Sequence, residues 1–156
     1  MQRPITGFHL DSESHWVAEL SCGHRQHVRH EPPFIERPWV ASAEGRASRL
    51  GRPLDCVRCD RREMPEGYAP YRRTAAFTDE SVPEALCKHH TTKRGVWALI
   101  HVARGQLEYR VGTPLDSIET LAPGTPGVVL PEVEHRVAPL GPVEFVVEFW
   151  RRQENA

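Results

Sequence analysis

The chain has 156 residues, a length that fits one medium domain or two small ones. Its apolar fraction of 39% and charged fraction of 26% are typical of a globular protein and exclude an intrinsically disordered one. The formal net charge of -1 provides no overall field that would attract nucleic acid or an anionic membrane, so neither is an expected partner.

The first forty residues predict a β-hairpin and no export or membrane signal. Residues 7–10 and 16–20 have the composition of strands, and the polar residues 11–14 between them predict a turn. The N-terminus lacks the apolar core and the small-residue cleavage site of a signal peptide, and no run approaches the roughly 20 apolar residues that span a bilayer. We therefore expect a cytoplasmic protein with no membrane partner.

Soft metal ligands gather directly after this hairpin. Cys22, His24, His27 and His30 fall within nine residues, and Cys56 and Cys59 follow at the Cys-x-x-Cys spacing that lets two thiolates hold one tetrahedral ion. In a chain with no export signal these cysteines are expected to be reduced. The pattern predicts a closed structural zinc site.

Its predicted ligands are Cys22, His24, Cys56 and Cys59.

Other arrangements of the same residues stay open. A redox role for Cys56 and Cys59 would require a βα context, which the following polar, Pro/Gly-containing segment does not provide. His27 or His30 could replace His24, bind a second ion or lie in solvent. A site with three protein ligands and one open position would instead be catalytic.

Turn residues then divide the chain. Ser42 can cap a short helix over residues 43–50, which Gly51 and Pro53 terminate. Residues 61–71 are polar, contain two prolines and a glycine, and predict a boundary, so we expect domains at residues 1–66 and 72–152. The first is small enough for a metal ion to contribute much of its stability.

The second domain is predicted to be mainly β. Residues 97–102 and 107–111 indicate a hairpin, and further strands are expected at 118–121, 127–130, 134–137 and 142–150. A weak helix is expected at residues 82–88, where Cys87 is interpreted as a small buried hydrophobe. Many short strands with Gly/Pro turns are typical of a small barrel or sandwich.

The N-terminal part resembles a small bacterial family of unknown function, the DUF3565-like proteins. The resemblance covers residues 2 to about 66 and rests on the CGHxQHxRHxP signature followed by CxxC. It brings no established activity, so it supports metal binding and a zinc-knuckle unit, similar to a zinc ribbon, and nothing further.

The C-terminal part resembles the TehB-like cupin family (DUF1971-like), which forms the N-terminal domain of the tellurite-resistance protein TehB. The matching segments include residues 71–74, 90–97, 105–109, 131–137 and 147–149. The resemblance implies a short double-stranded β-helix and suggests a role in tellurite, metalloid or stress tolerance. We see no methyltransferase domain after this unit, so we do not expect the tellurite-methylating activity of the longer proteins of this family.

The resemblance also implies a place for a second divalent metal. The enzymatic cupin pattern would put ligands near Thr91, Lys93 and Ala98, which offer none. His90 lies near the first cupin motif, His135 occupies the second, and Glu148 on the last strand could face the same cavity. Two histidines and a carboxylate can hold a divalent metal. Alternatively, these side chains are structural and Glu148 forms an ion pair.

A ligand pocket is expected beside these residues. Trp97 and Tyr109 could line its mouth or belong to the core, while Lys93 and Arg73 could attract an oxyanion through charge-assisted hydrogen bonds. The leading hypothesis is a two-domain metalloprotein with zinc in the first unit and a cupin that binds a small molecule or oxyanion. Homo-oligomerisation is compatible with the sequence.

Two further hypotheses come from other functional classes. One is a metal-dependent cupin enzyme, an oxygenase or isomerase that uses His90 and His135. The other is an adaptor whose zinc unit binds nucleic acid or protein through its arginines, although interleaved acidic residues break any basic stripe. The arginines concerned are Arg25, Arg29, Arg58, Arg61 and Arg62.

Overall fold

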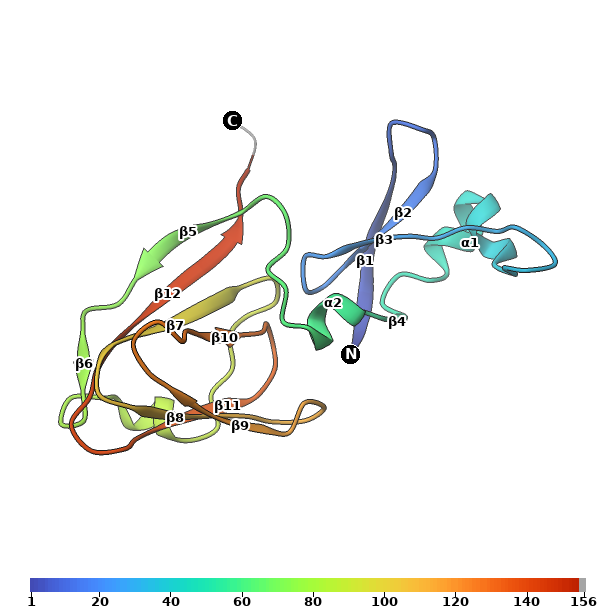
Figure 1. Ribbon diagram of the computed structural model, residues 1–156. Coiled ribbons are helices and arrows are strands. Elements are labelled where there is room, and N and C mark those ends of the chain that lie inside the picture. Colours follow the sequence, from blue (N-terminus) through green and yellow to red (C-terminus); the bar gives the residue numbers. More distant parts are fainter. Residues whose placement is uncertain (155–156) are drawn as a thin grey trace. The chain divides into compact units, whose positions relative to one another are not determined.

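The computed structural model describes residues 1–154 and divides the chain into two compact units. Unit 1 is Met1–Arg61, and unit 2 begins at Arg62. Both are built mainly from β-strands, and each is described on its own (Figure 1). Within the described residues, no helix combines the length and the apolar character needed to cross a membrane.

Unit 1 contains one antiparallel sheet of four strands in the order β3-β2-β1-β4. The predicted hairpin is formed by β1 and β2, and its turn is held by the Asp11 carboxylate, which accepts hydrogen bonds from the backbone N–H groups of Glu13 and His15 at 2.9 and 2.8 Å. The strands are β1 (Gln2–Leu10), β2 (Trp16–Leu20), β3 (Arg25–His27) and β4 (Pro53–Asp55).

Three short helices complete unit 1. They are the 3-10 helix η1 (Pro38–Ala41), α1 (Ala43–Ala47) and α2 (Val57–Asp60). The predicted cap is present, since Ser42 Oγ accepts from the N–H of Gly45 at 3.0 Å. The helix ends at Ala47, earlier than the predicted residue 50, because the chain turns back into β4 through Gly51, whose φ of +80° suits glycine.

Unit 2 has two sheets. The larger has the order β10-β7-β12-β5, with β6 beside β12, and the smaller has the order β11-β8-β9. The strands of the larger sheet are β5 (Tyr68–Arg73), β6 (Phe77–Thr78), β7 (Trp97–Arg104), β10 (Gly127–Val129) and β12 (Glu144–Arg152). Those of the smaller are β8 (Leu107–Val111), β9 (Ser117–Leu121) and β11 (His135–Pro139).

The predicted hairpin of residues 97–102 and 107–111 is wrong. β7 pairs with β10 and β12, whereas β8 pairs with β9 and β11, so the chain crosses from one sheet to the other between them. Gly105 makes this corner: its φ is +77°, and a Cβ there would lie 2.1 Å from the carbonyl oxygen of Pro142. Alternating side chains predict a strand but do not select its partner.

The remaining element predictions hold with small changes. The expected helix at residues 82–88 is a single 3-10 turn, η2 (Glu84–Cys87), in which Cys87 is half-buried. Residues 68–71, expected in a linker, belong to β5, in which Tyr68, Ala69 and Pro70 pair with β12. The largest fully buried side chains of unit 2 are Trp97, Tyr109, Phe145, Leu107 and Leu121.

Candidate metal centre and barrel cavity

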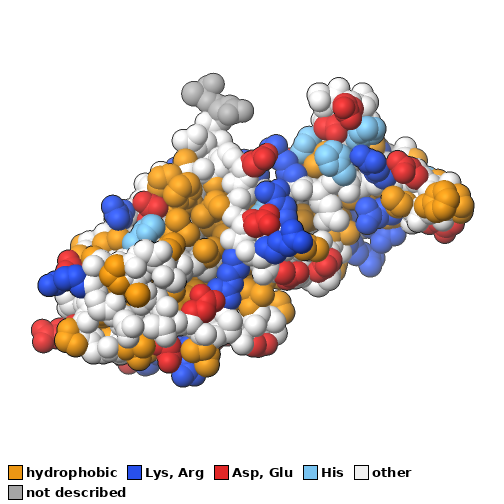
Figure 2. Space-filling model, viewed as in Figure 1, with side chains coloured by type: hydrophobic (Ala, Val, Ile, Leu, Met, Phe, Trp, Pro, Cys, Tyr) orange, Lys and Arg blue, Asp and Glu red, His pale blue; other side chains and the backbone are white. Residues whose placement is uncertain are grey.

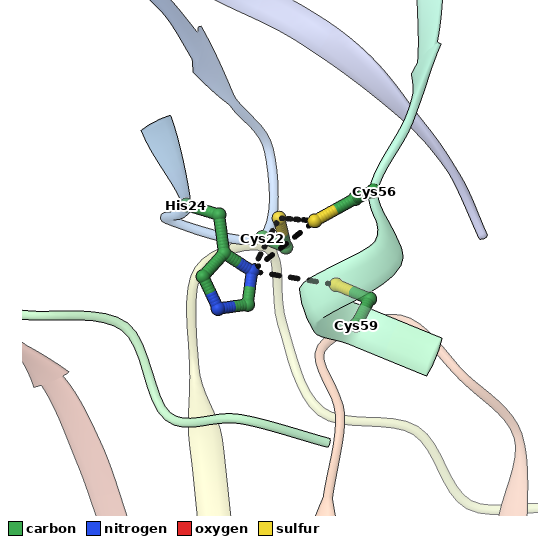
Figure 3. Close-up of side chains that lie close together, drawn as sticks. All are labelled: Cys22, His24, Cys56 and Cys59. Atoms are coloured by element: carbon green, nitrogen blue, oxygen red, sulfur yellow. Dashed lines mark hydrogen bonds between the residues drawn. The ribbon is translucent and has the colours of Figure 1, made fainter. Parts of the chain in front are cut away.

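A tight turn after β2 presents the first two predicted zinc ligands. Gly23 donates its backbone N–H to the Leu20 carbonyl at 2.8 Å, and Leu20 donates to the His24 carbonyl at 3.0 Å. The φ of Gly23 is +93°, a conformation that favours glycine. This turn brings the side chains of Cys22 and His24 to the same side of the chain (Figure 3).

The second pair comes from the start of α2. Cys56 has extended backbone dihedrals at the N-cap position, directly after β4, and Cys59 lies within the helix. The N–H of Cys59 donates to the Cys56 carbonyl at 3.1 Å, which closes the turn between the two thiols. β4 pairs with β1 and β1 with β2, so a single sheet joins both ligand pairs.

The four ligand atoms have the spacing of a tetrahedral zinc site. The Nδ1 atom of His24 lies 3.4 Å from the Cys22 sulfur, 3.4 Å from that of Cys56 and 3.6 Å from that of Cys59, and the Cys22 and Cys56 sulfurs are 3.9 Å apart (Figure 3). Ordinary zinc–ligand bond lengths in a tetrahedron require about 3.6 Å between N and S and about 3.8 Å between two sulfurs. The cluster therefore fits a zinc ion held by three thiolates and one imidazole.

The cluster is closed to solvent. Cys22 and Cys59 are 0% exposed, His24 is 2% and Cys56 is 4% exposed. Closed four-ligand sites are typical of structural zinc, whereas catalytic sites keep an open position. Within residues 1–154 this is the only group of three or more His, Cys, Asp or Glu side chains close enough to hold a metal ion.

Side chains of the cluster shift one another's pKa values. Hydrogen bonding with Cys56 and Cys59 raises the pKa of the Cys22 thiol, and hydrogen bonding with Cys22 lowers that of Cys56. Burial lowers the pKa of the His24 ring, but hydrogen bonds with Cys56 and Cys59 outweigh it and raise that pKa to about 9. The lowered pKa of Cys56 favours a thiolate beside the imidazole, and a divalent cation would be attracted to it.

His27 and His30, which the sequence leaves without a role, have other partners. His27 Nε2 lies 2.8 Å from the Asp11 Oδ2 atom at the hairpin turn, and His30 Nδ1 accepts from the N–H of Arg37 at 3.0 Å. Hydrogen bonds from the His15 N–H and from His27 lower the pKa of Asp11 to about 2. Figure 2 shows histidine side chains, in pale blue, on the surface near the β1–β2 hairpin.

These positions predict which histidine controls metal content. Replacing His24 with alanine is expected to lower bound zinc well below one ion per chain, because it removes one of four ligands. His27→Ala and His30→Ala are the matched controls and should keep full zinc content. Elemental analysis of the three purified variants checks this, and loss of zinc from either control would contradict the assignment of His24.

Unit 2 contains a partly open cavity of about 310 Å³, lined by residues of both of its sheets. Most of its wall is apolar, because it is formed largely by the inward-facing apolar side chains of β7, β10, β11 and β12. Polar groups enter at few points, among them His90 and His135. The other lining residues are Arg72, Thr74, Phe77, Pro83, Ala85, Leu86, Thr92, Ala98, Ile100, Val129, Val137, Phe145, Val147 and Phe149.

His90 and His135 meet in this wall. Their backbones form an antiparallel bridge, with His90 N to His135 O at 3.0 Å and His135 N to His90 O at 2.9 Å. Their rings also contact each other, with His90 Nδ1 3.2 Å from His135 Nε2. The structure therefore brings together the two predicted histidines of the cupin motifs.

Glu148 does not join them, so the predicted three-ligand set is not assembled. Its neighbours Val147 and Phe149 line the cavity, and strand alternation puts Glu148 on the opposite face of the sheet. There it accepts a hydrogen bond from Trp150 Nε1 at 2.8 Å and lies 3.4 Å from His101 Nε2. The expected second metal site lacks its carboxylate.

The predicted pocket residues lie elsewhere as well. Trp97 and Tyr109 are fully buried core residues, and the Tyr109 hydroxyl donates to the Val128 carbonyl at 2.8 Å, while burial raises its pKa. Lys93 and Arg73 are exposed and do not line the cavity. The neighbouring Arg72 does, although it is also exposed. Neighbouring residues of a strand point to opposite faces, so only one of Arg72 and Arg73 can face the cavity. The sequence does not show which face of β5 points inward.

The fold and the cluster together define a mainly β protein with a cupin-like unit and a Cys₃His cluster that could hold a metal ion. Residues 6–63 match the family described as protein of unknown function (DUF3565), and residues 72–147 match the TehB-like domain. No curated protein matches the chain.

Solved structures agree on the fold of unit 2. TehB from Haemophilus influenzae has a TM-score of 0.52 and 23% identity, and the match covers 56% of this chain but 32% of that one. A protein from E. coli (strain K12) has a TM-score of 0.54 and 22% identity, with 59% of this chain and 98% of that chain covered. The chain thus spans about a third of TehB, and at these identities the likeness concerns the fold alone.

Proposed function

We propose that the protein is a zinc-containing ligand-binding protein: zinc holds unit 1 together, and the cavity of unit 2 binds a small, mainly apolar molecule. The zinc part is supported by the closed tetrahedral spacing of the four ligand atoms. A reducing compartment such as the cytoplasm suits this proposal, because the cysteines that hold the ion must stay reduced.

The cavity carries the functional part of the proposal. A volume of about 310 Å³ lies within the range of small-molecule sites, and such sites combine an apolar wall with a few polar groups. Arg72 is the one permanently cationic side chain that the described residues contribute to this wall. The lining therefore favours an apolar ligand over the oxyanion also expected from the sequence. A role in tellurite, metalloid or stress tolerance rests on the family likeness alone.

The other two hypotheses find less support. A metal-dependent cupin enzyme would need a third ligand beside His90 and His135, and residues 1–154 bring none to them. For the adaptor, Arg29 lies 3.8 Å from Glu31 and Arg62 forms an ion pair with Glu119, so these arginines do not form an uncompensated basic surface.

Binding of toluene and phenol tests the cavity. Both fit its volume, and ligand-observed NMR should detect binding of at least one to the purified protein. Ala85 lines the cavity yet is exposed, so Ala85→Phe should block binding without disturbing the core. Ala103→Phe, at an exposed position on β7 outside the lining, is the control. Equal binding by both variants would contradict the proposed site.

Zinc affinity is expected to rise with pH. His24 must lose its proton to bind metal through Nδ1, and its pKa in the cluster is raised to about 9. Below that pH zinc has to displace the proton, so affinity should increase about tenfold per pH unit for each proton released, and fall toward acid. Competition with a chromophoric chelator between about pH 6 and 8 measures the slope; a flat profile would contradict this assignment.

A further inference from the structure

The hydrogen bonds of the two cavity histidines determine where their protons lie. The Nδ1 atom of His135 is 3.0 Å from the Val133 carbonyl oxygen, which can only accept, so Nδ1 carries the proton. Burial lowers the pKa of His135, and the ring is neutral at physiological pH. Its Nε2 atom is therefore an acceptor.

The same reasoning then fixes His90. Its Nδ1 atom is 3.2 Å from the His135 acceptor, so it must be the donor of that hydrogen bond. In the neutral ring, the Nε2 atom of His90 consequently carries a lone pair and no proton. No residue among positions 1–154 donates a hydrogen bond to this atom, and His90 is one of the residues that line the cavity.

The two threonine hydroxyls of the cavity wall each have a partner in the protein. The Thr92 hydroxyl donates to the Val96 carbonyl at 2.8 Å, and the Thr74 hydroxyl accepts from the N–H of Val147 at 3.0 Å. Arg72 is exposed, and its guanidinium can only donate. An apolar cavity thus offers one histidine acceptor, oriented by the chain from Val133 through His135 to His90.

Resting on the proposed function of the cavity, we propose that its ligand is a small apolar molecule that carries one hydrogen-bond donor, such as a hydroxyl, and that this donor binds Nε2 of His90. His135 is then a positioning residue: it fixes the tautomer of His90 and does not itself contact the ligand's polar group. An apolar body fills the space lined by the strands, and the single donor pairs with the His90 lone pair.

Phenol and toluene test this pairing, because they have nearly the same shape and differ by a hydroxyl in place of a methyl group. His90→Phe is expected to reduce the ratio of phenol to toluene affinity at least about tenfold, since an unpaired hydroxyl in an apolar cavity is strongly disfavoured. His90→Gln, whose amide oxygen can accept, should retain part of the ratio. His89→Phe is the matched control, because that neighbouring side chain is 79% exposed and pairs with Glu134.

A second measurement on the unaltered protein keeps the test independent of variant folding. In ¹⁵N NMR of the histidine rings, phenol should shift the Nε2 resonance of His90 and toluene should leave it in place. Equal shifts, or an unchanged affinity ratio in His90→Phe, would overturn the donor assignment while cavity binding itself stands. Failure of both probes to bind would overturn the inference together with the proposed cavity function.

Discussion

Cys59→Ser is expected to cost the protein its zinc and to unfold unit 1. The Cys59 thiol is 0% exposed and lies 3.6 Å from His24 Nδ1 in the cluster that joins α2 to the turn after β2. Unit 1 has only 61 residues, and zinc in comparable small units contributes about 10–16 kcal/mol of apparent binding free energy to folding. Loss of one ligand should therefore exceed the stability such a small unit has from its core alone.

The expected loss is confined to unit 1. Zinc content by elemental analysis and amide NMR of the full chain measure it: signals of residues 1–61 should collapse, whereas those of the β7–β12 sheet should persist. A strong chelator should reproduce the effect. Cys87→Ser is the matched control, because Cys87 lies half-buried in η2 of unit 2 and outside the cluster. A Cys59→Ser protein with one zinc per chain and a folded unit 1 would contradict the structural role.

Trp97→Ala is expected to destabilise unit 2 by about 3–5 kcal/mol. The Trp97 side chain is 0% exposed and is the largest fully buried one among the described residues, so truncation removes apolar burial and leaves a void. The change should appear as a lower denaturation midpoint of unit 2, while zinc content stays at the level of the unaltered protein.

The control for this prediction is Ile118→Ala. Ile118 belongs to the same unit but is 63% exposed, so its truncation should change the free energy of unfolding by less than about 0.5 kcal/mol. Chemical denaturation followed by fluorescence and circular dichroism compares the variants. Loss of phenol or toluene binding in Trp97→Ala without loss of stability would place Trp97 in the ligand pocket and not in the core.

Features that depend on local chemistry were predictable from the sequence. The Cys-x-His and Cys-x-x-Cys spacings identify the four candidate metal ligands, because each pair is formed within one tight turn whose geometry depends on neighbouring residues. The Ser42 cap and the strands β1, β2 and β7 to β12 follow from equally local patterns. The histidines left over beside the cluster could not be assigned, since Asp11 and Arg37, their partners, are known only once the loops are folded.

Features that depend on which strands pair could not be predicted from the sequence and are known only from the tertiary structure. Glu148 carries the chemistry of a metal ligand, but the pleat turns it away from the cavity, and a shift of one residue would have reversed that outcome. The crossing from β7 to β8 at Gly105 likewise has the local pattern of a hairpin. The ligands of unit 1 were thus determined by short-range spacing, whereas the pairing of His90 with His135 arose from strand packing 45 residues apart in the chain.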